Sequence, residues 1–296
     1  GATMKILLFG KNGQVGWELQ RTLLPLGRVD AFGHRELDLA DAAAVRRKLD
    51  ELRPDVIVNA AAYTAVDKAE SEPDLAHAVN AAAPALLAQE AKQRGALLIH
   101  YSTDYVFDGA KAAPYVETDL TNPLGAYGRS KLAGEAGIRA AGCDHLIFRT
   151  SWVYAARGAN LLRTILRLAA EREELRIVAD QVGAPTWARL IAEATAHALR
   201  QAMQERRSGN FESGVFHLTA AGETSWHGFA SAIVAGRSGL RAFVFEPGAG
   251  FGQRSRVIQC ASGGHGGVER CLAMLAARPG HVAADEALIR AIALQT

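Results

Sequence analysis

A glycine-rich turn near the N-terminus constrains the fold more than any other stretch of this sequence. It joins a continuous apolar run at residues 4–9, typical of a strand buried on both faces of a parallel sheet, to a helix predicted to reach about Leu24. Its glycines, spaced G-x-x-G-x-x-G, are Gly10, Gly13 and Gly16. Such a turn places backbone N–H groups at a helix N-terminus against a pyrophosphate. We therefore interpret it as part of a dinucleotide-binding site; an ordinary tight strand–helix turn is the alternative.

Strands and helices alternate along the first half of the chain. Further buried strands are predicted over residues 29–32, 55–59, 96–101 and 145–149. Helices are predicted over residues 41–52, over 73–94 with an interruption at Pro84, and around Tyr127. This βαβ order predicts an α/β fold with a doubly wound, Rossmann-like parallel sheet, forming an NAD(P)-binding domain over residues 4–150.

The second half of the sequence is less regular. Helices are expected over about 158–173, 187–206 and from Thr224 or Ser225 to Ala235, and short strands over 175–178, 214–218 and 241–245. These elements are too few for a large independent core. We interpret residues 151–296 mainly as a smaller substrate-binding region at the C-terminal side, interleaved with the main domain, with an atypical tail from about residue 246.

Composition argues against several classes of partner. The 296 residues carry a formal net charge of +2 with no long basic run, so neither nucleic acid nor an anionic membrane surface is expected as a partner. No apolar run approaches the roughly 18 residues of a transmembrane helix. The three cysteines are scattered, as in a reduced cytosolic protein. We therefore expect a cytoplasmic protein.

Tyr127 and Lys131 are one turn apart and so share a face of their predicted helix. A free tyrosine titrates near pH ~10 and is a poor acid at neutral pH. A lysine cation beside it favours the phenolate and is expected to lower that pKa, which suits a general acid. The alternative is an exposed tyrosine packed on a lysine stem. The hydroxyls of Ser102 and Thr103, which follow the fourth strand, are expected at the same edge of the sheet.

The tip of the second predicted strand bears on the choice of cofactor. A carboxylate there binds the ribose 2′-hydroxyl of NAD, but this tip is Gly33-His34-Arg35. Arg35 is placed to bind a 2′-phosphate, which favours NADPH as the cofactor. The alternative is a solvated arginine, and NADH remains possible. After the third strand, Asn59–Thr64 contains three successive alanines, which let a flat cofactor approach the backbone closely.

Six motifs, standing in order, resemble one known family. They are Gly10–Gly16 (GKNGQVG), Asn59–Glu70 (NAAAYTAVDKAE), Ser102–Phe107 (STDYVF), Tyr127–Lys131 (YGRSK), Arg149–Tyr154 (RTSWVY) and Asp180–Thr186 (DQVGAPT). Over roughly residues 4–240 the chain is similar to the dTDP-4-dehydrorhamnose reductase family of extended short-chain dehydrogenases/reductases. The glycine and Tyr-x-x-x-Lys motifs belong to the whole superfamily, whereas the second and fifth motifs are much more specific to this family.

The resemblance implies NAD(P)H-dependent reduction of the 4-keto group of dTDP-4-dehydro-L-rhamnose, the last step of dTDP-rhamnose synthesis for lipopolysaccharide O-antigen. By this resemblance, Tyr127 would donate the proton. Lys131 would hold the nicotinamide ribose and lower the pKa of Tyr127. Thr103 would donate a hydrogen bond to the carbonyl oxygen of the substrate. Asp104 and Trp152 would contact the sugar. The alternatives without a binding role are a solvated turn carboxylate for Asp104 and a core indole for Trp152. The cofactor would lie against Gly10, Gly13, Gln14, Val15, Gly16, Arg35, Asp38, Leu39, Ala62, Tyr63, Thr64, Tyr101, Tyr127 and Lys131.

Two departures from the family pattern concern the C-terminal side. Residues 246–266 are rich in glycine and lack the proline-rich stretch that helps shape the substrate side in the family. A reading-frame change in the gene is our hypothesis for this tail, and an uninterrupted tail in the same frame in a close relative would reject it. Arg189 lies near where some relatives place a glutamate for a magnesium ion at a dimer contact, so we predict no metal. The chain is expected to be a monomer or a homodimer.

Two other functions compete with this one. Nucleotide-sugar dehydratases of the same superfamily carry Thr-Asp-Glu, whose glutamate removes a carbon-bound proton, and related epimerases share the fold. Here Thr103 and Asp104 are followed by Tyr105, so that base is missing and simple reduction is favoured. The second alternative is a non-catalytic regulatory subunit of the methionine adenosyltransferase β type, which the retained chemical groups do not exclude.

Overall fold

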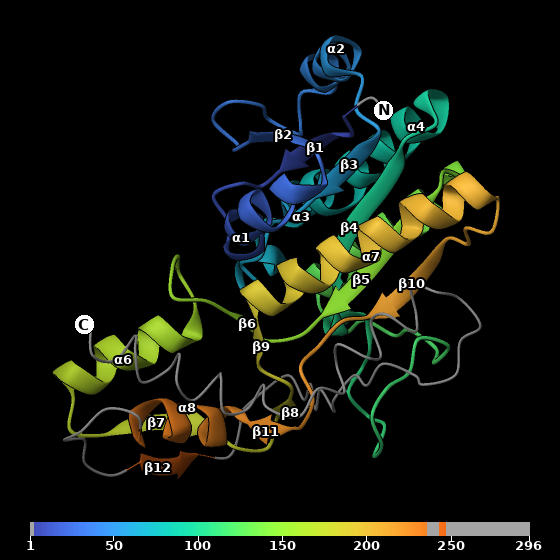
Figure 1. The fold of residues 1–296 in the computed structure, drawn as a ribbon. Helices are drawn as coiled ribbons and strands as arrows, with labels where there is room; N and C mark the ends of the chain where they lie inside the picture. The colour runs from blue at the N-terminus through green and yellow to red at the C-terminus, as the bar shows by residue number, and fades with distance from the viewer. Residues whose placement is uncertain (1–2, 236–242, 247–296) are drawn as a thin grey trace.

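The computed structural model describes residues 3–235 and 243–246, and a six-stranded parallel sheet forms its centre (Figure 1). The strand order is β10-β5-β4-β3-β1-β2. The strands are β1 (Lys5–Phe9), β2 (Arg28–Phe32), β3 (Val56–Asn59), β4 (Leu97–Thr103), β5 (His145–Thr150) and β10 (Gly214–His217). Strand order reverses between β1 and β3, and in such sheets ligands bind beyond the carboxyl ends at this point. The predicted doubly wound α/β fold is confirmed.

Helices cover both faces of this sheet (Figure 1). Alternate residues of β1 enter the two resulting cores, because side chains of a strand point to opposite faces. Ile6 and Leu8 pack with α1 (Gln14–Thr22) and α7 (Ala188–Ser208). Leu7 and Phe9 pack on the other face, whose helices are α2 (Ala42–Leu52), α4 (Ala83–Arg94) and α5 (Ala126–Ala141).

Local sequence signals explain several helix boundaries. Asp41 caps α2 as predicted, its carboxylate accepting the N–H of Ala44 at 2.9 Å. The predicted interruption near Pro84 is present: α3 (Pro73–His77) passes through a π-helical turn, η3 (Ala78–Ala82), before α4 begins. Short 3-10 turns are η1 (Leu24–Leu26), η2 (Lys68–Glu70) and η4 (Asp104–Val106).

Strand β4 extends further than the sequence predicted. Thr103 pairs with Thr150 of β5, so Ser102 and Thr103 belong to the strand instead of following it. A neighbouring strand supplied the hydrogen-bond partners that prolong β4, and the amino-acid pattern alone does not reveal them. The two hydroxyl residues are consequently held by the sheet.

A second group of elements lies beyond the carboxyl ends of the sheet (Figure 1). It comprises β6 (Val153–Tyr154), α6 (Leu161–Glu171), β7 (Leu175–Val178), β8 (Val182–Gly183), β9 (Thr186–Trp187), β11 (Thr224–Ser225), α8 (Trp226–Ala235) and β12 (Phe243–Glu246). A separate core joins α6 and α8 through Leu162, Ile165, Phe229 and Ile233. The domain division at residue 150 stays a prediction, and the tail expected from about residue 246 lies outside the described residues.

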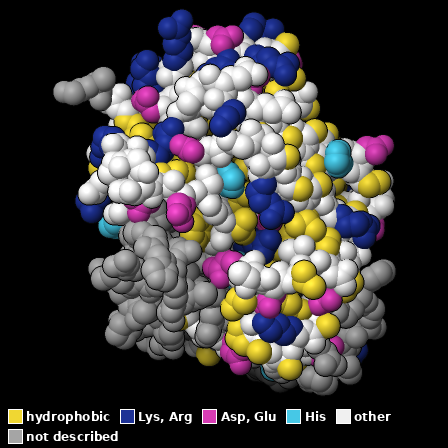
Figure 2. Space-filling view, turned by 90° about the vertical axis from the view of Figure 1, so that its right-hand side faces the viewer, with side chains coloured by type: hydrophobic (Ala, Val, Ile, Leu, Met, Phe, Trp, Pro, Cys, Tyr) yellow, Lys and Arg dark blue, Asp and Glu magenta, His cyan; other side chains and the backbone are white. Residues whose placement is uncertain are grey.

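The surface agrees with the balanced composition. On the face shown in Figure 2, basic and acidic side chains are interspersed among polar and apolar ones, without one continuous basic area. Within residues 3–235 and 243–246, no helix combines the length and the apolar character needed to cross a bilayer.

Candidate active site

The principal crevice opens where the strand order reverses. It encloses about 630 Å³ at the carboxyl ends of β1, β3 and β4. Residues from many parts of the chain line it: Phe9, Gly10, Asn12, Gly13, Gln14, Val15, Phe32, Gly33, His34, Leu37, Asp38, Leu39, Ala60, Ala61, Ala62, Tyr63, Thr64, Leu75, Val79, Tyr101, Ser102, Tyr127, Lys131, Thr150, Val153, Gly158 and Ala159. The crevice therefore brings the glycine turn, the alanine stretch and the Tyr/Lys pair together.

The glycine turn has the geometry that a bound dinucleotide requires. Gly10 has φ +83°, and a Cβ there would lie 2.6 Å from the backbone carbon of Ala60. A Cβ on Gly16 would lie 1.9 Å from the carbonyl oxygen of Gly10, so this glycine lets α1 pack directly on the turn. Gly13 is the N-cap of α1 and lines the crevice. The side-chain oxygen of Gln14 is buried there without a hydrogen-bond partner. These features fit a pyrophosphate held at the start of α1.

Two of the expected cofactor residues lie outside the lining of the crevice. Gly16 is buried beneath the turn, and Arg35 is exposed beyond it, while the neighbouring His34 lines the crevice. Sequence reasoning did not single out the lining residues Asn12, Thr150, Val153, Gly158 and Ala159. Thr150 directly follows the strand predicted over residues 145–149, so its place at the carboxyl end of the sheet could have been inferred. The segment with Gly158 and Ala159 carries no comparable sequence signal.

Tyr127 is buried at the crevice, on the first turn of α5. Its ring meets that of Tyr105 edge-on, with centroids 5.5 Å apart. Burial raises the pKa of Tyr127 to about 12; a hydrogen bond with Thr103 acts in the opposite direction and the charge of Asp104 raises the pKa further. The expectation that Lys131 lowers the pKa of Tyr127 is therefore wrong for this structure. Desolvation is the largest effect on that pKa, and Lys131 is not among the groups that shift it.

Lys131 is directed at the backbone of β4. Its ammonium donates to the carbonyl oxygen of Tyr101 at 2.6 Å, and its pKa falls to about 8 because the side chain is buried. The charge of Glu135, one turn further along α5, opposes that fall. Glu135 is itself buried and accepts from Ser102 Oγ at 2.6 Å and from two nitrogens of Arg149 at 2.9 and 2.7 Å. This network fastens α5 to the ends of β4 and β5.

A chain of hydrogen bonds leads from residue 151 to the phenol of Tyr127. Ser151 Oγ donates to Asp104 Oδ2 at 3.0 Å, and Thr103 Oγ1 donates to Asp104 Oδ1 at 3.1 Å. The N–H of Tyr105 donates to Thr103 Oγ1 at 3.2 Å. Asp104 is 5% exposed, and burial raises its pKa to about 6 although both hydroxyls oppose that rise. The alternative of a solvated turn carboxylate at Asp104 is therefore wrong.

Trp152 lies beside this chain but not in the lining of the crevice. Its indole is 8% exposed and stacks on Trp226, with ring centroids 3.5 Å apart and planes at 10°. Its backbone has a φ of +45°, in the left-handed region that a bulky side chain seldom adopts. The structure thus presents Trp152 as a core indole, which was one of the two roles expected for it.

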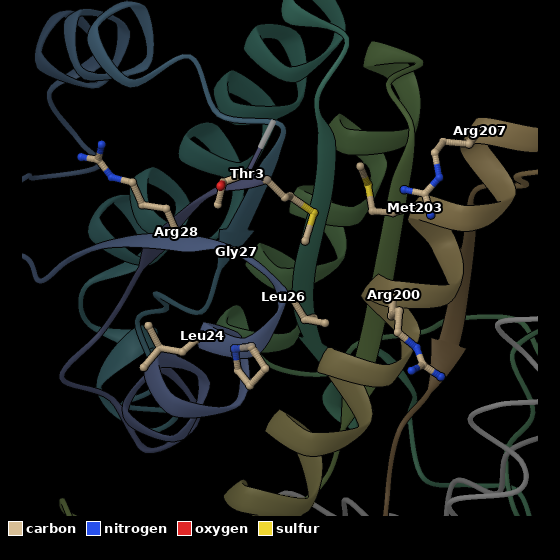
Figure 3. A pocket seen from close by; sticks show the side chains of 10 residues that line it. Thr3, Leu24, Leu26, Gly27, Arg28, Arg200, Met203 and Arg207 are labelled. Carbon is tan, nitrogen blue, oxygen red and sulfur yellow. The ribbon is translucent and has the colours of Figure 1, made fainter. Parts of the chain in front are cut away.

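A second cavity, of about 620 Å³, lies near the amino ends of β1 and β2, between η1 and α7 (Figure 3). Arg28, Arg200 and Arg207 border an apolar wall there. Figure 3 shows Arg28 and Arg200 pointing in opposite directions, and Arg28 pairs with Asp30 at 3.0 Å. The cavity contains no carboxyl, phenol or imidazole that could transfer a proton, so we place catalysis in the first crevice.

Metal ligands do not cluster in the part of the chain that the structure describes. Arg189, the residue that prompted the prediction of no metal, pairs with Glu193 one turn along α7 at 3.1 Å. The absence of a metal stays a prediction.

Several known proteins are similar to this chain over most of its length. The model of the RmlD substrate binding domain matches residues 4–242. A dTDP-4-dehydrorhamnose reductase of Burkholderia thailandensis is 60% identical over 232 residues, 78% of each chain. The enzyme of that name from Escherichia coli K12 is 51% identical over 234 residues, 78% of this chain and 77% of the relative. The crystal structure of a dTDP-4-dehydrorhamnose reductase from Bacillus anthracis in complex with NADP is 32% identical with a TM-score of 0.77, covering 87% of this chain and 91% of that one.

Proposed function

Because this chain belongs to the dTDP-4-dehydrorhamnose reductase family, we propose that it uses NADPH to reduce the 4-keto group of dTDP-4-dehydro-L-rhamnose, forming dTDP-L-rhamnose. The observation that carries this proposal is the meeting, at one crevice, of the glycine turn with Tyr127 and Lys131. The curated relatives, which are reductases, favour this function over a non-catalytic regulatory subunit.

The cofactor would be held by the residues that line the crevice. The N-terminus of α1, with Gly13 and Gln14, would bind the pyrophosphate. The adenosine would lie near Asp38 and Leu39, and the alanine stretch would pass under the nicotinamide half. When bound, NADPH supplies the hydride. Arg35 remains our candidate for the 2′-phosphate, reached by movement of its exposed side chain.

The protein groups supply the proton and stabilise developing charge. With its raised pKa, Tyr127 is fully protonated at neutral pH and is ready to donate to the alkoxide that forms at the sugar C4. The Thr103 hydroxyl would hydrogen-bond that oxygen as negative charge grows on it. Lys131 would hold the nicotinamide ribose and offset the charge of the phenolate left behind. Asp104 would orient Thr103 through their 3.1 Å hydrogen bond.

The remaining roles follow from the same family membership. We propose that the enzyme works in the cytoplasm as a monomer or a homodimer, on a small nucleotide sugar, with residues 151–296 mainly on the substrate side. NADH stays open as a second cofactor. An epimerase or dehydratase is disfavoured because Tyr105 stands where a dehydratase carries its glutamate.

The direct test follows NADPH absorbance after addition of dTDP-4-dehydrorhamnose. Tyr127→Phe should lower turnover by about 10²-fold or more while NADPH binding remains, because only the transferred proton is removed. Tyr115→Phe is the matched control, since Tyr115 is buried outside the crevice. Wild-type protein without turnover, indistinguishable from Tyr127→Phe, would favour the non-catalytic role.

A further inference from the structure

The stacked pair of Trp152 and Trp226 sits at the junction between the sheet and the second group of elements. Trp152 follows β5, whereas Trp226 begins α8. Trp226 is itself fixed, since its indole N–H donates to Gln181 Oε1 at 3.1 Å. Gln181 immediately precedes β8, which pairs with β11, the strand leading into Trp226. The paired strands β8 and β11 therefore hold Trp226 in place against the indole of Trp152; we call the site that encloses this indole the socket.

The other wall of this socket is a glycine of β8. A Cβ on Gly183 would lie 2.4 to 2.8 Å from the Cε2, Cζ2 and Nε1 atoms of Trp152, so only glycine allows this approach. The backbone of Trp152 is tied as well, because its carbonyl oxygen accepts the N–H of Thr186 at 3.1 Å. Ring and backbone contacts together hold Trp152 at a φ of +45°. A bulky residue keeps this conformation only when its surroundings impose it.

The fixed conformation of Trp152 determines where its neighbours point. Thr150 and Val153 line the crevice, and Ser151 between them donates to Asp104 Oδ2 at 3.0 Å. Within this segment the Trp152 side chain therefore enters the socket, whereas Thr150 and Val153 line the crevice. Rotation of the backbone at Trp152 would carry the Ser151 hydroxyl away from the carboxylate.

We propose that Trp226 is a positioning residue of this enzyme: by stacking on Trp152 it fixes residues 150–153 and holds the Ser151 hydroxyl on the carboxylate of Asp104, next to Tyr127. The inference rests on the proposed function, because Asp104 matters for turnover only if Thr103 and Tyr127 act on a carbonyl. Trp226 acts through Trp152 and Ser151 and touches neither reacting group. Trp152 then serves as the link between the two regions.

Loss of the stack has two consequences that can be measured without turnover. The indole protons of Trp152 lie over the ring of Trp226, with centroids 3.5 Å apart, so ring-current shielding shifts their ¹H NMR signals upfield. Trp226→Leu should abolish this upfield shift. It should also raise the pKa of the Asp104 carboxyl by about half a unit to one unit, the value of one hydrogen bond, since Ser151 lowers that pKa in the intact protein. The titratable groups facing Asp104 are Tyr105 and Tyr127, and both remain in the variant.

The experiment compares three variants of the full chain with the wild type. Trp226→Leu is the main variant, Trp226→Phe keeps an aromatic ring in the socket, and Trp187→Leu is the matched control in the same group of elements. The ¹H NMR signals of Trp152 and the ¹³C NMR titration of Asp104, assigned with Trp152→Phe and Asp104→Asn, come first, and steady-state kinetics follow. We expect kcat to fall about 3- to 10-fold in Trp226→Leu with the KM for NADPH unchanged. Trp226→Phe should stay within about 2-fold, and Trp187→Leu should match the wild type in kcat and in the titration of Asp104.

Several results would overturn the proposal. Wild-type Trp152 signals without the upfield shift would refute the stack, and an unchanged Asp104 titration in Trp226→Leu would refute its effect on Ser151. Equal changes in Trp187→Leu would reduce the role of Trp226 to general packing. If Trp226→Leu does not fold, Gln181→Ala removes only the hydrogen bond to the Trp226 indole. It should reduce the upfield shift of the Trp152 signals and raise the Asp104 pKa, and no change in either would refute the proposal. Wild-type protein with both spectroscopic signatures but no reductase activity would refute the proposed function instead.

Discussion

Replacing Lys131 by methionine should make the protein more stable and inactive at the same time. Methionine approximates the length of the lysine stem and carries no charge. Lys131 is 2% exposed, and its ammonium donates to the carbonyl oxygen of Tyr101 at 2.6 Å. A buried cation in this setting costs folding free energy. In the proposed mechanism its charge offsets that of the Tyr127 phenolate, which gives a reason for keeping a destabilising group.

The size of the effect follows from the pKa. Burial lowers the pKa of Lys131 from 10.5 to about 8, so the unfolded chain binds more protons between these two values. Stability therefore rises with pH through this window and is lost as pH falls towards 8. At about pH 7 the cost to the folded state is roughly 3 kcal/mol, at ~1.4 kcal/mol per pKa unit. Losing the hydrogen bond to Tyr101 costs about 1 kcal/mol, which leaves Lys131→Met more stable than wild type by about 2 kcal/mol.

Urea unfolding at two pH values provides the assay. The gain should shrink by about 2 kcal/mol between roughly pH 7 and pH 9.5, because the wild-type lysine becomes neutral in the folded state. Lys92→Met, at an exposed position of α4, is the control and should show no such pH dependence. A variant less stable than wild type at neutral pH, or a gain of equal size at both pH values, would refute the reasoning.

Three further predictions concern the crevice. Gly16→Ala should lower the free energy of unfolding by about 1–3 kcal/mol, because the new Cβ would lie 1.9 Å from the carbonyl oxygen of Gly10. A Cβ on Gly13 would lie 3.4 Å from the same oxygen, so Gly13→Ala should unfold in urea like the wild type but raise the KM for NADPH. The wild-type kcat should rise with pH through an apparent pKa of about 6, as Asp104 ionises, and a pH–rate profile of Asp104→Asn should lack this limb. Arg35→Ala should raise the KM for NADPH by about 3- to 10-fold and leave that for NADH unchanged; equal effects on both cofactors would remove Arg35 from the 2′-phosphate site.

Boundaries of elements were predicted best where the cause is local. Asp41 caps α2 through its own side chain, and Pro84, which lacks the backbone N–H of other residues, lies in the first turn of α4 just after the π-helical turn. The length of β4 was underestimated because its last residues are strand only through pairing with β5. The segment around Gly158 reaches the crevice through tertiary packing alone, so no spacing in the sequence pointed to it.

The sequence by itself determined the parallel sheet with its glycine turn, the family, and the placement of Tyr127 and Lys131 one helical turn apart. Each of these depends on short-range information: glycines three residues apart, apolar runs of strand length, and one helical turn. Tertiary structure alone decided the environment of these groups. It buried Tyr127, so that its pKa rises, and it brought Ser151, Asp104 and Thr103 into one hydrogen-bonded chain fixed by a tryptophan stack. Desolvation and through-space contacts set a pKa, and neither is contained in the spacing of residues along the chain.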